Sequence, residues 1–325
     1  MADFLVEIGI AEQRALACQS GHVKAAAIYW PGALVCGQVE DAILVSRRSG
    51  SQRGTARFAS GQEALVDRLP RNAQEGAIIR LEVTRAALAE RGRYKRAHAR
   101  PSDLAPVPAP DLAAQLGAEG HNAQIVHHFP DPQNWDMVWA QAWDRHLEFA
   151  GGALDIALAP AMTVIDVDGT LPPAQLAQAA TPAVASALQH LALAGNIAID
   201  FPTLAARDDR RKIDQALEVA LAGWPHERTA MNGFGLVQII SRIRRASLPA
   251  LLMNDPAGAA ARHLLARAER ITEPGALLLV CHPDVALRLS ARWIASLERR
   301  SGRHVRIESR ESLALDAGFA QAVVL

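Results

Sequence analysis

Two short apolar runs each lead into carboxylates, and these carboxylates are the side chains in the sequence best suited to carry out chemistry. Residues 161–165 precede Asp166 and Asp168, and residues 195–199 precede Asp200. Both runs are typical of buried β-strands, and parallel or mixed sheets bring such strand ends to one edge. Carboxylates that meet at one edge are ligands for a hard divalent cation. The pattern therefore predicts a Mg²⁺ site, with Mn²⁺ as an acceptable substitute.

The composition limits the classes of protein that could hold such a site. The chain has 325 residues, 50% of them hydrophobic, which is enough for two or three globular domains. The formal net charge is zero, so any site for a polyanion must be a local patch. The three cysteines are scattered without a Cys-x-x-Cys spacing, which argues against a disulfide framework and against structural zinc.

The first residues and the apolar runs bear on the cellular compartment. The N-terminus lacks the basic region of a signal peptide, and no uninterrupted apolar run is long enough to span a bilayer. We therefore expect a cytoplasmic protein without a membrane partner.

Short strands dominate the first third of the chain. Residues 4–30 predict two or three strands, with at least one hairpin. Five more short strands are predicted at residues 33–39, 42–45, 54–58, 63–66 and 77–83. About five short strands separated by glycines and charged turns favour a small closed barrel of the OB type over a β-sandwich.

A basic strip and a proline-rich segment follow the predicted barrel. Residues 85–100 form the most basic stretch of the chain and contain Tyr94. A basic strip with an aromatic residue beside a barrel fits binding of single-stranded nucleic acid, and a solvated connector explains it equally well. Residues 101–110 contain four prolines and predict a linker or an extended crossing segment.

The remaining residues predict alternating helices and strands. Trp135, Trp139 and Trp143 are spaced four apart, so they form one helical stripe, which we expect to pack in the core rather than to stack on bases. His127 and His128 have no third ligand at a suitable spacing, so we expect them on a solvated loop. Helices are predicted at residues 173–193 and 207–222. After residue 256, a helix, a strand, a helix and two strands predict a small α+β unit.

Residues 164–171 resemble the first motif of haloacid dehalogenase-like phosphatases. This resemblance implies that Asp166 is a nucleophile and Asp168 an acid/base, with Mg²⁺ neutralising the phosphate. That family also needs a later lysine, for which Lys212 is available, and a strand that ends in a pair of acids. The apolar run at residues 276–281 is not followed by such a pair. The phosphatase interpretation also leaves the barrel and the C-terminal unit unexplained.

A second resemblance covers nearly the whole chain, and it is to the catalytic half of the ribonuclease E/G family in a shortened form. The motifs of that family occur here in order. They are three barrel strands (37–39, 56–61 and 75–85), a helix with a Gly-Gly turn (139–152), Thr-x-Ile-Asp-x-Asn (163–168), Ile-x-Ile-Asp-Phe (197–201) and Phe-Gly-Leu-x-Glu with a basic tail (234–248). The resemblance implies an inserted OB-type RNA-binding barrel and a small C-terminal domain.

The same resemblance implies an endoribonuclease that cleaves single-stranded RNA with a metal-activated water and leaves 5′-phosphate and 3′-hydroxyl ends. By position, Asp166 and Asp200 would bind Mg²⁺, and Asp168 stands where the family has Asn. Gln238 replaces the family's Glu. The cysteine zinc link and the region that senses a 5′-monophosphate are absent, which leaves self-association as a homodimer open. The residues expected to contact RNA are Phe58, Arg91, Arg93, Lys95, Arg96, Arg242 and Arg244.

The sequence thus predicts a multidomain α/β (α+β) protein with a catalytic core like that of DNase I or RNase H. The expected divisions are N-terminal strands at 1–31, the barrel and basic strip at 32–100, a linker at 101–120, the catalytic domain at 121–250 and the small C-terminal domain at 256–325. The preferred function is a Mg²⁺-dependent endoribonuclease. A catalytically weak RNA-binding relative is the first alternative, and the phosphatase is the second.

Overall fold

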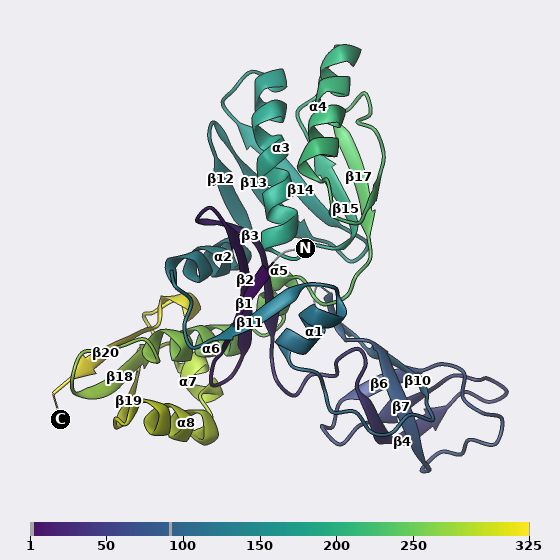
Figure 1. The fold of residues 1–325 in the computed structure, drawn as a ribbon, viewed down its shortest axis with the longest axis vertical. Coiled ribbons are helices and arrows are strands. Elements are labelled where there is room, and N and C mark those ends of the chain that lie inside the picture. The colour runs from purple at the N-terminus through teal and green to yellow at the C-terminus, as the bar shows by residue number, and fades with distance from the viewer. Residues whose placement is uncertain (1–2, 91–92, 325) are drawn as a thin grey trace.

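The computed structural model describes residues 3–90 and 93–324, which form a mixed α/β structure. A four-stranded sheet stands at its centre, in the order β11 (Asn122–Val126), β1 (Asp3–Ile8), β2 (Gln13–Gln19) and β3 (His22–Tyr29) (Figure 1). The predicted N-terminal strands are therefore present. Strand β11 lies parallel to β1, although the sequence placed its residues in the catalytic domain.

Five strands close the predicted barrel, at the lower right of Figure 1. They are β4 (Val39–Arg47), β5 (Gly54–Arg57), β6 (Glu63–Val66), β7 (Ile78–Arg85) and β10 (Ala97–Pro101). The expected closed barrel is confirmed, but one of its strands was predicted wrongly. Residues 33–38 form turns, and the strand that closes the barrel comes from the end of the basic strip. In β10, Ala97 and Ala99 point into the barrel core and are 1% and 2% exposed.

The segment between the barrel and the rest of the chain is only partly a linker. Strands β8 (Leu88–Glu90) and β9 (Arg93–Lys95) pair with each other between the barrel strands β7 and β10, so they belong to the barrel's own span. After β10, Val107 bridges to Val39 of the barrel. Helix α1 (Leu112–Ala118) then begins, because Asp111 accepts a hydrogen bond from the Ala114 N–H (2.8 Å) and caps the helix. The side chains of Leu112 and Leu116 pack against the central sheet and are buried. The predicted linker therefore ends before α1.

A six-stranded sheet forms the upper part of the molecule in Figure 1. Its order is β12 (His146–Phe149), β13 (Gly152–Leu158), β14 (Thr163–Gly169), β15 (Gly195–Asp200), β17 (Leu236–Ser241) and β16 (Glu227–Arg228). Strands β14 and β15 are parallel, and the other neighbours are antiparallel. Helices α3 (Pro173–His190) and α4 (Arg207–Ala220) cover one face.

The main hydrophobic core joins this sheet to the central sheet. Helix α3 lies between them, and helix α2 (Gln133–Asp144) contributes Trp135 and Trp139, which are 0% and 6% exposed. The prediction that the tryptophan stripe packs in the core is confirmed for these two residues, and Trp143 is half-buried. His127 and His128 lie on the expected loop with their rings stacked 4.2 Å apart.

The C-terminal unit has the predicted α+β character. Helices α5 (Leu248–Asn254) and α6 (Pro256–Ala268) lead into a three-stranded sheet of β19 (Val305–Ser309), β18 (Ala276–Cys281) and β20 (Phe319–Val323). A short 3₁₀ helix, η1 (Leu315–Ala317), precedes β20. The single helix predicted at 283–300 is two helices, α7 (Pro283–Arg288) and α8 (Ala291–Ser301), because Ser290 caps a new helix through the Trp293 N–H (3.3 Å). Within residues 3–90 and 93–324, no helix is long and apolar enough to cross a membrane.

Candidate functional site

Asp166 and Asp200 lie side by side on the parallel strands β14 and β15. They are direct partners in the register of these two strands, so their side chains leave the same face of the sheet. Asp155 of β13 pairs with Asp166 from the other side, and His146 of β12 pairs with Asp155. The structure thus places three carboxylates and a histidine in one row across four strands.

The row lies on the face of the sheet that the helices leave uncovered. In β14, Ile165 and Val167 are 0% and 6% exposed and pack under the helices, whereas Asp166 and Asp168 alternate with them and are exposed. In β15, Ile197 and Ile199 are buried and Asp200 is exposed, although Ala198 on the face of Asp200 is also buried. A two-residue period therefore presents the acids to solvent and holds their strands firmly in the core.

The carboxylates repel one another. The pKa of Asp166 is raised above its ordinary value, first by partial burial and then by the negative charges of Asp200, Asp168 and Asp155. Asp168 accepts a hydrogen bond from the Gly169 N–H (3.1 Å). Asp155 accepts one from His146 Nδ1 (2.8 Å), and this contact raises the pKa of the histidine. A cation between Asp166 and Asp200 would relieve this repulsion.

The donor set suits a hard cation that keeps part of its water. Asp166 and Asp200 supply carboxylate oxygens only, the ligand type that Mg²⁺ prefers, and Mg²⁺ is commonly bound by one or two carboxylates. Among the residues that the structure describes, no three or more His, Cys, Asp or Glu side chains converge closely enough to hold a metal ion. Water and substrate would therefore have to complete the coordination.

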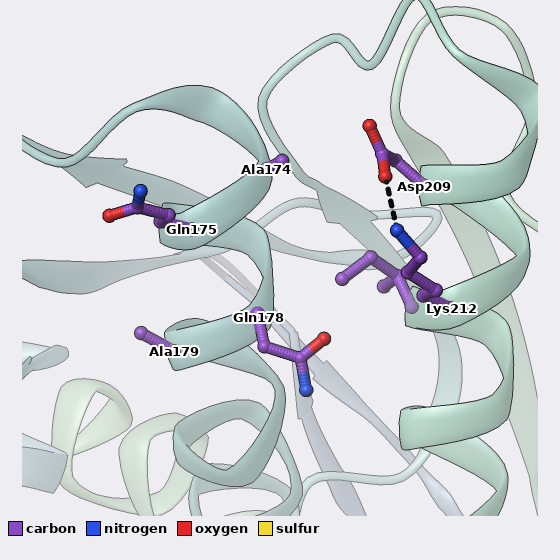
Figure 2. A pocket seen from close by; sticks show the side chains of 7 residues that line it. Ala174, Gln175, Gln178, Ala179, Asp209 and Lys212 are labelled. Carbon is purple, nitrogen blue, oxygen red and sulfur yellow. Dashed lines mark hydrogen bonds and ion pairs between the residues drawn. The ribbon is translucent and has the colours of Figure 1, made fainter.

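Lys212, the lysine that the phosphatase interpretation requires, lies elsewhere. It is on α4 and donates a hydrogen bond to Asp209 (2.9 Å). Together with Gln178 of α3 it lines a hollow of about 430 Å³ between the two helices, on the helix-covered side of the sheet (Figure 2). The carboxylate row is on the other face, so the structure does not bring Lys212 to Asp166.

Gln238, which replaces the glutamate of the ribonuclease motif, lies outside the carboxylate row. In the register of β15 and β17 it pairs with Ala198, and Leu236 is the partner of Asp200. Its Nε2 donates to Asn196 Oδ1 (2.9 Å), and Asn196 Nδ2 donates to the carbonyl oxygen of Ala161 (3.3 Å). Gln238 thus ties β17 to the turn before β14.

The predicted RNA contacts in and near the barrel are dispersed. Phe58 is 3% exposed in the barrel core, so its ring cannot stack on a base and its assignment as an RNA contact is corrected. Arg91 lies outside the described residues. Arg93 belongs to β9. Lys95 is exposed, and Arg96 is exposed beside Glu63, with Nη1 and Oε2 3.5 Å apart.

Arg242 and Arg244 fit the prediction best. Both are exposed, and no ion pair to either is found among residues 3–90 and 93–324. They follow β17 directly and precede α5, and the β8 strand of the basic strip approaches that helix. The helix that follows this basic tail thus contacts the start of the basic strip.

Several of the other arginines on the barrel surface are paired with neighbouring carboxylates. Ion pairs join Arg57 to Glu63 (3.0 Å), Arg80 to Asp41 (2.8 Å) and Arg100 to Glu82 (2.8 Å). Exposed pairs of this kind are weak and leave little net field for a polyanion. Any RNA contact at the barrel must therefore come from a limited part of its surface.

Sequence reasoning missed Asp155, His146 and Phe234. Asp155 and His146 were assigned no role, because only the register of β12, β13 and β14 brings them beside Asp166. Phe234 belongs to the Phe-Gly-Leu motif, but the sequence does not show that it is 81% exposed. The Asn-Gly-Phe-Gly sequence around Phe234 indicates a turn, and this was the one sequence feature that could have suggested an exposed ring.

No model of a known protein family matches the chain, and no curated protein sequence matches it either.

Gly235, next to the site, has no room for a side chain. Its φ is +93°, and a Cβ there would lie 2.2 Å from the carbonyl oxygen of Phe201, directly after Asp200. We expect Gly235→Ala to lower the free energy of unfolding by about 1–3 kcal/mol or more, because the strained backbone and the clash add. Denaturant unfolding measures this change.

Gly233→Ala is the matched control, because a Cβ at Gly233 meets no atom within 4 Å. It should unfold at nearly the same denaturant concentration as the wild type. Equal stability of the two variants would show that the turn is not held against β15 as described.

Proposed function

We propose that the protein is a Mg²⁺-dependent endoribonuclease that cleaves single-stranded RNA and leaves 5′-phosphate and 3′-hydroxyl ends. The observation that carries the proposal is the register of Asp166 and Asp200, which are direct partners on adjacent parallel strands of an uncovered sheet face. Two carboxylates in this position can hold one hard cation at a site that a long substrate can reach.

The arrangement of the domains also supports the proposal. A closed five-stranded barrel precedes the six-stranded sheet, and a small α+β unit follows it, as the resemblance to the ribonuclease E/G family implies. We infer that the barrel is of the OB type, and that the sheet is a nuclease core related to that of RNase H. The barrel, the basic tail at Arg242 and Arg244, and the basic strip would then contact the RNA backbone.

The residues of the site have separate tasks in this proposal. Asp166 and Asp200 would hold the cation, which would supply a water of lowered pKa to attack the phosphodiester. Asp168 lies two residues from Asp166 on the same face and adds its negative charge there. It strengthens attraction for the cation and helps to position the group that attacks the phosphodiester. His146 Nδ1 donates a hydrogen bond to Asp155 (2.8 Å), so we assign Asp155 no part in holding the cation.

A direct assay tests the proposal. The protein is incubated with an end-labelled single-stranded RNA, with Mg²⁺ or with EDTA, and in parallel with a small phosphomonoester. The double variant Asp166→Ala/Asp200→Ala, purified in the same way, controls for contaminating nucleases. We expect internal RNA cleavage that requires Mg²⁺, with products that a ligase specific for 5′-phosphates accepts.

Two other results would reject the enzyme assignment. RNA binding without cleavage identifies a catalytically weak RNA-binding relative. Turnover of the monoester that depends on Asp166 and Asp168 but not on Asp200 identifies a phosphatase.

A further inference from the structure

Phe234 is a large apolar side chain left in water beside the carboxylate row. Its ring is 81% exposed, on the turn between β16 and β17. An isolated exposed apolar residue is ordinary. Phe234 is not isolated, because Leu236 and Ile240 of β17 are 38% and 54% exposed on the uncovered face, with Gln238 between them. Val237 and Ile239 between them are 0% exposed on the other face. We call Phe234, Leu236 and Ile240 the β17 stripe.

The backbone that carries Phe234 is held in place. Asn232 Oδ1 accepts hydrogen bonds from the Phe234 N–H (2.9 Å) and the Leu236 N–H (3.1 Å). The carbonyl oxygen of Phe234 accepts one from Thr203 Oγ1 (3.2 Å). The next residue, Gly235, has a positive φ of 93° and touches the backbone of Phe201. The exposed ring thus projects from a fixed turn. Because the backbone of this turn is already ordered, ligand binding would cost little conformational entropy there.

The β17 stripe runs directly beside the acid pair. Leu236 is the register partner of Asp200, so the two side chains share a face at the spacing of neighbouring strands, about 4.8 Å. Phe234 comes two residues before Leu236, on the turn that leads into β17. An apolar surface and a pair of carboxylates therefore meet within the length of one nucleotide.

We propose that Phe234 stacks on a nucleobase of the RNA, next to the phosphodiester held at Asp166 and Asp200, and that Leu236 supports the same base. This inference rests on the proposed function and adds a positioning residue to it. Base stacking on an aromatic ring tolerates any sequence, because every base has a flat π-face. Phe234 would therefore fix where the strand lies without selecting a sequence.

The charges beside the stripe favour a nucleotide over a protein as its occupant. A protein surface that covered Leu236 would also cover Asp200 and Asp166, and burying these charges without partners is costly. A nucleotide combines a flat apolar base with a phosphate that a cation can bridge to the two carboxylates. It therefore matches both parts of the surface at once.

The test measures binding of a fluorescein-labelled single-stranded RNA by anisotropy, with Ca²⁺ in place of Mg²⁺ so that chemistry is slow. Wild type, Phe234→Ala, Phe234→Tyr and Leu287→Ala are compared. Leu287 is the matched control, because it is 83% exposed on α7 of the C-terminal unit and not on the six-stranded sheet that carries the carboxylate row. A series of oligonucleotides, each lacking one base, locates the stacked position. Mg²⁺-dependent cleavage of the intact RNA by each protein is measured in parallel.

We expect Phe234→Ala to weaken binding about tenfold or more, and Phe234→Tyr and Leu287→Ala to bind as the wild type does. The wild type should discriminate against the RNA that lacks one particular base, and Phe234→Ala should lose this discrimination.

Other outcomes overturn the inference in distinct ways. If the wild type cleaves RNA and Phe234→Ala binds it equally well, the inference fails while the proposed function stands. If the wild type neither binds nor cleaves RNA, both fail. If Phe234→Ala instead abolishes self-association measured by sedimentation, the β17 stripe is an interface between copies of the chain.

Discussion

Replacing Asp200 with Asn should abolish Mg²⁺-dependent RNA cleavage and, at the same time, make the metal-free protein more stable. The loss should be about a hundredfold or more, because changes to groups that only support a metal ligand already cost 10–100-fold. Asn keeps the size of the side chain and removes the charge. The strand pairing between β14 and β15 should therefore survive, and cleavage should fall through loss of the cation.

The gain in stability follows from the pKa of Asp166. Burial and the charge of Asp200 raise this pKa above its ordinary value of 3.8. A carboxyl whose pKa is raised by folding favours the folded state while it is protonated, and this contribution is lost as the pH rises through the folded pKa. Asp200→Asn removes one source of the shift, so at pH 7 the variant should be more stable, on the order of 0.5 kcal/mol for exposed charges. The difference should shrink as the pH falls toward 4.

Mg²⁺ should reverse the order of the two proteins. A cation that binds only the folded wild type adds about 2.7 kcal/mol at a hundred times its dissociation constant, and Asp200→Asn should gain little. Thermal unfolding with and without Mg²⁺ measures both effects. Asp155→Asn is the informative comparison, since Asp155 neighbours Asp166 but is engaged by His146. If Asp155→Asn loses cleavage and Asp200→Asn does not, the cation lies on the other side of Asp166.

The fold could be predicted where the sequence has strong alternation or a complete motif. The apolar runs before Asp166 and Asp200 are strands, and the tryptophan spacing gave a buried helix face. The closing strand of the barrel was missed, because residues 97–100 alternate Ala-His-Ala-Arg. Alanine is a weak hydrophobic signal, so the inward positions of this strand are visible only when the barrel is closed. Two of the basic residues that suggested a binding strip, His98 and Arg100, are the outward positions of this strand.

The sequence predicted Asp166 and Asp200 as site residues but not Asp155, because Asp155 depends on strand register. Side chains on neighbouring strands meet only if the register of the two strands places them opposite each other, and register depends on turns that periodicity does not specify. Asp155 reaches Asp166 because the turn after β13 is closed by the hydrogen bond from the Ala159 N–H to the Met162 carbonyl oxygen (3.0 Å). Phe58 comes directly after β5, and the sequence did not determine whether its ring points into the barrel core or out to solvent.

Replacing Arg14 with Met should cause the largest loss of stability of any change considered, about 3–5 kcal/mol in the free energy of unfolding. Arg14 is 1% exposed between the central sheet and α2. Its guanidinium forms an ion pair with Glu7, lies 3.7 Å from Glu12, and stands 5.6 Å from the ring centre of Trp135. Removing it leaves two buried carboxylates without their main counter-charge.

The pH dependence of this loss identifies its cause. Burial already raises the pKa of Glu12 above its ordinary value of 4.5, and the charge of Arg14 opposes that rise. Without Arg14 the folded pKa rises further, so folding favours the protonated carboxyl more strongly. This contribution of protonated Glu12 to the free energy of unfolding is fully present below the pKa that Glu12 has in the unfolded chain. It is lost as the pH rises through the pKa that Glu12 has in the folded protein. The deficit of Arg14→Met should therefore be largest at pH 7 and should narrow as the pH falls toward 5.

Two comparisons separate loss of charge from loss of packing. Arg80→Met breaks an exposed ion pair with Asp41 and should leave the unfolding midpoint almost unchanged. The double variant Glu7→Leu/Arg14→Met replaces the ion pair by apolar groups and should recover part of the deficit, because one buried charge then no longer lacks a partner. A deficit that is equal at pH 5 and pH 7, and that the double variant does not reduce, would show that Arg14 acts through packing against Trp135 and Phe129 instead.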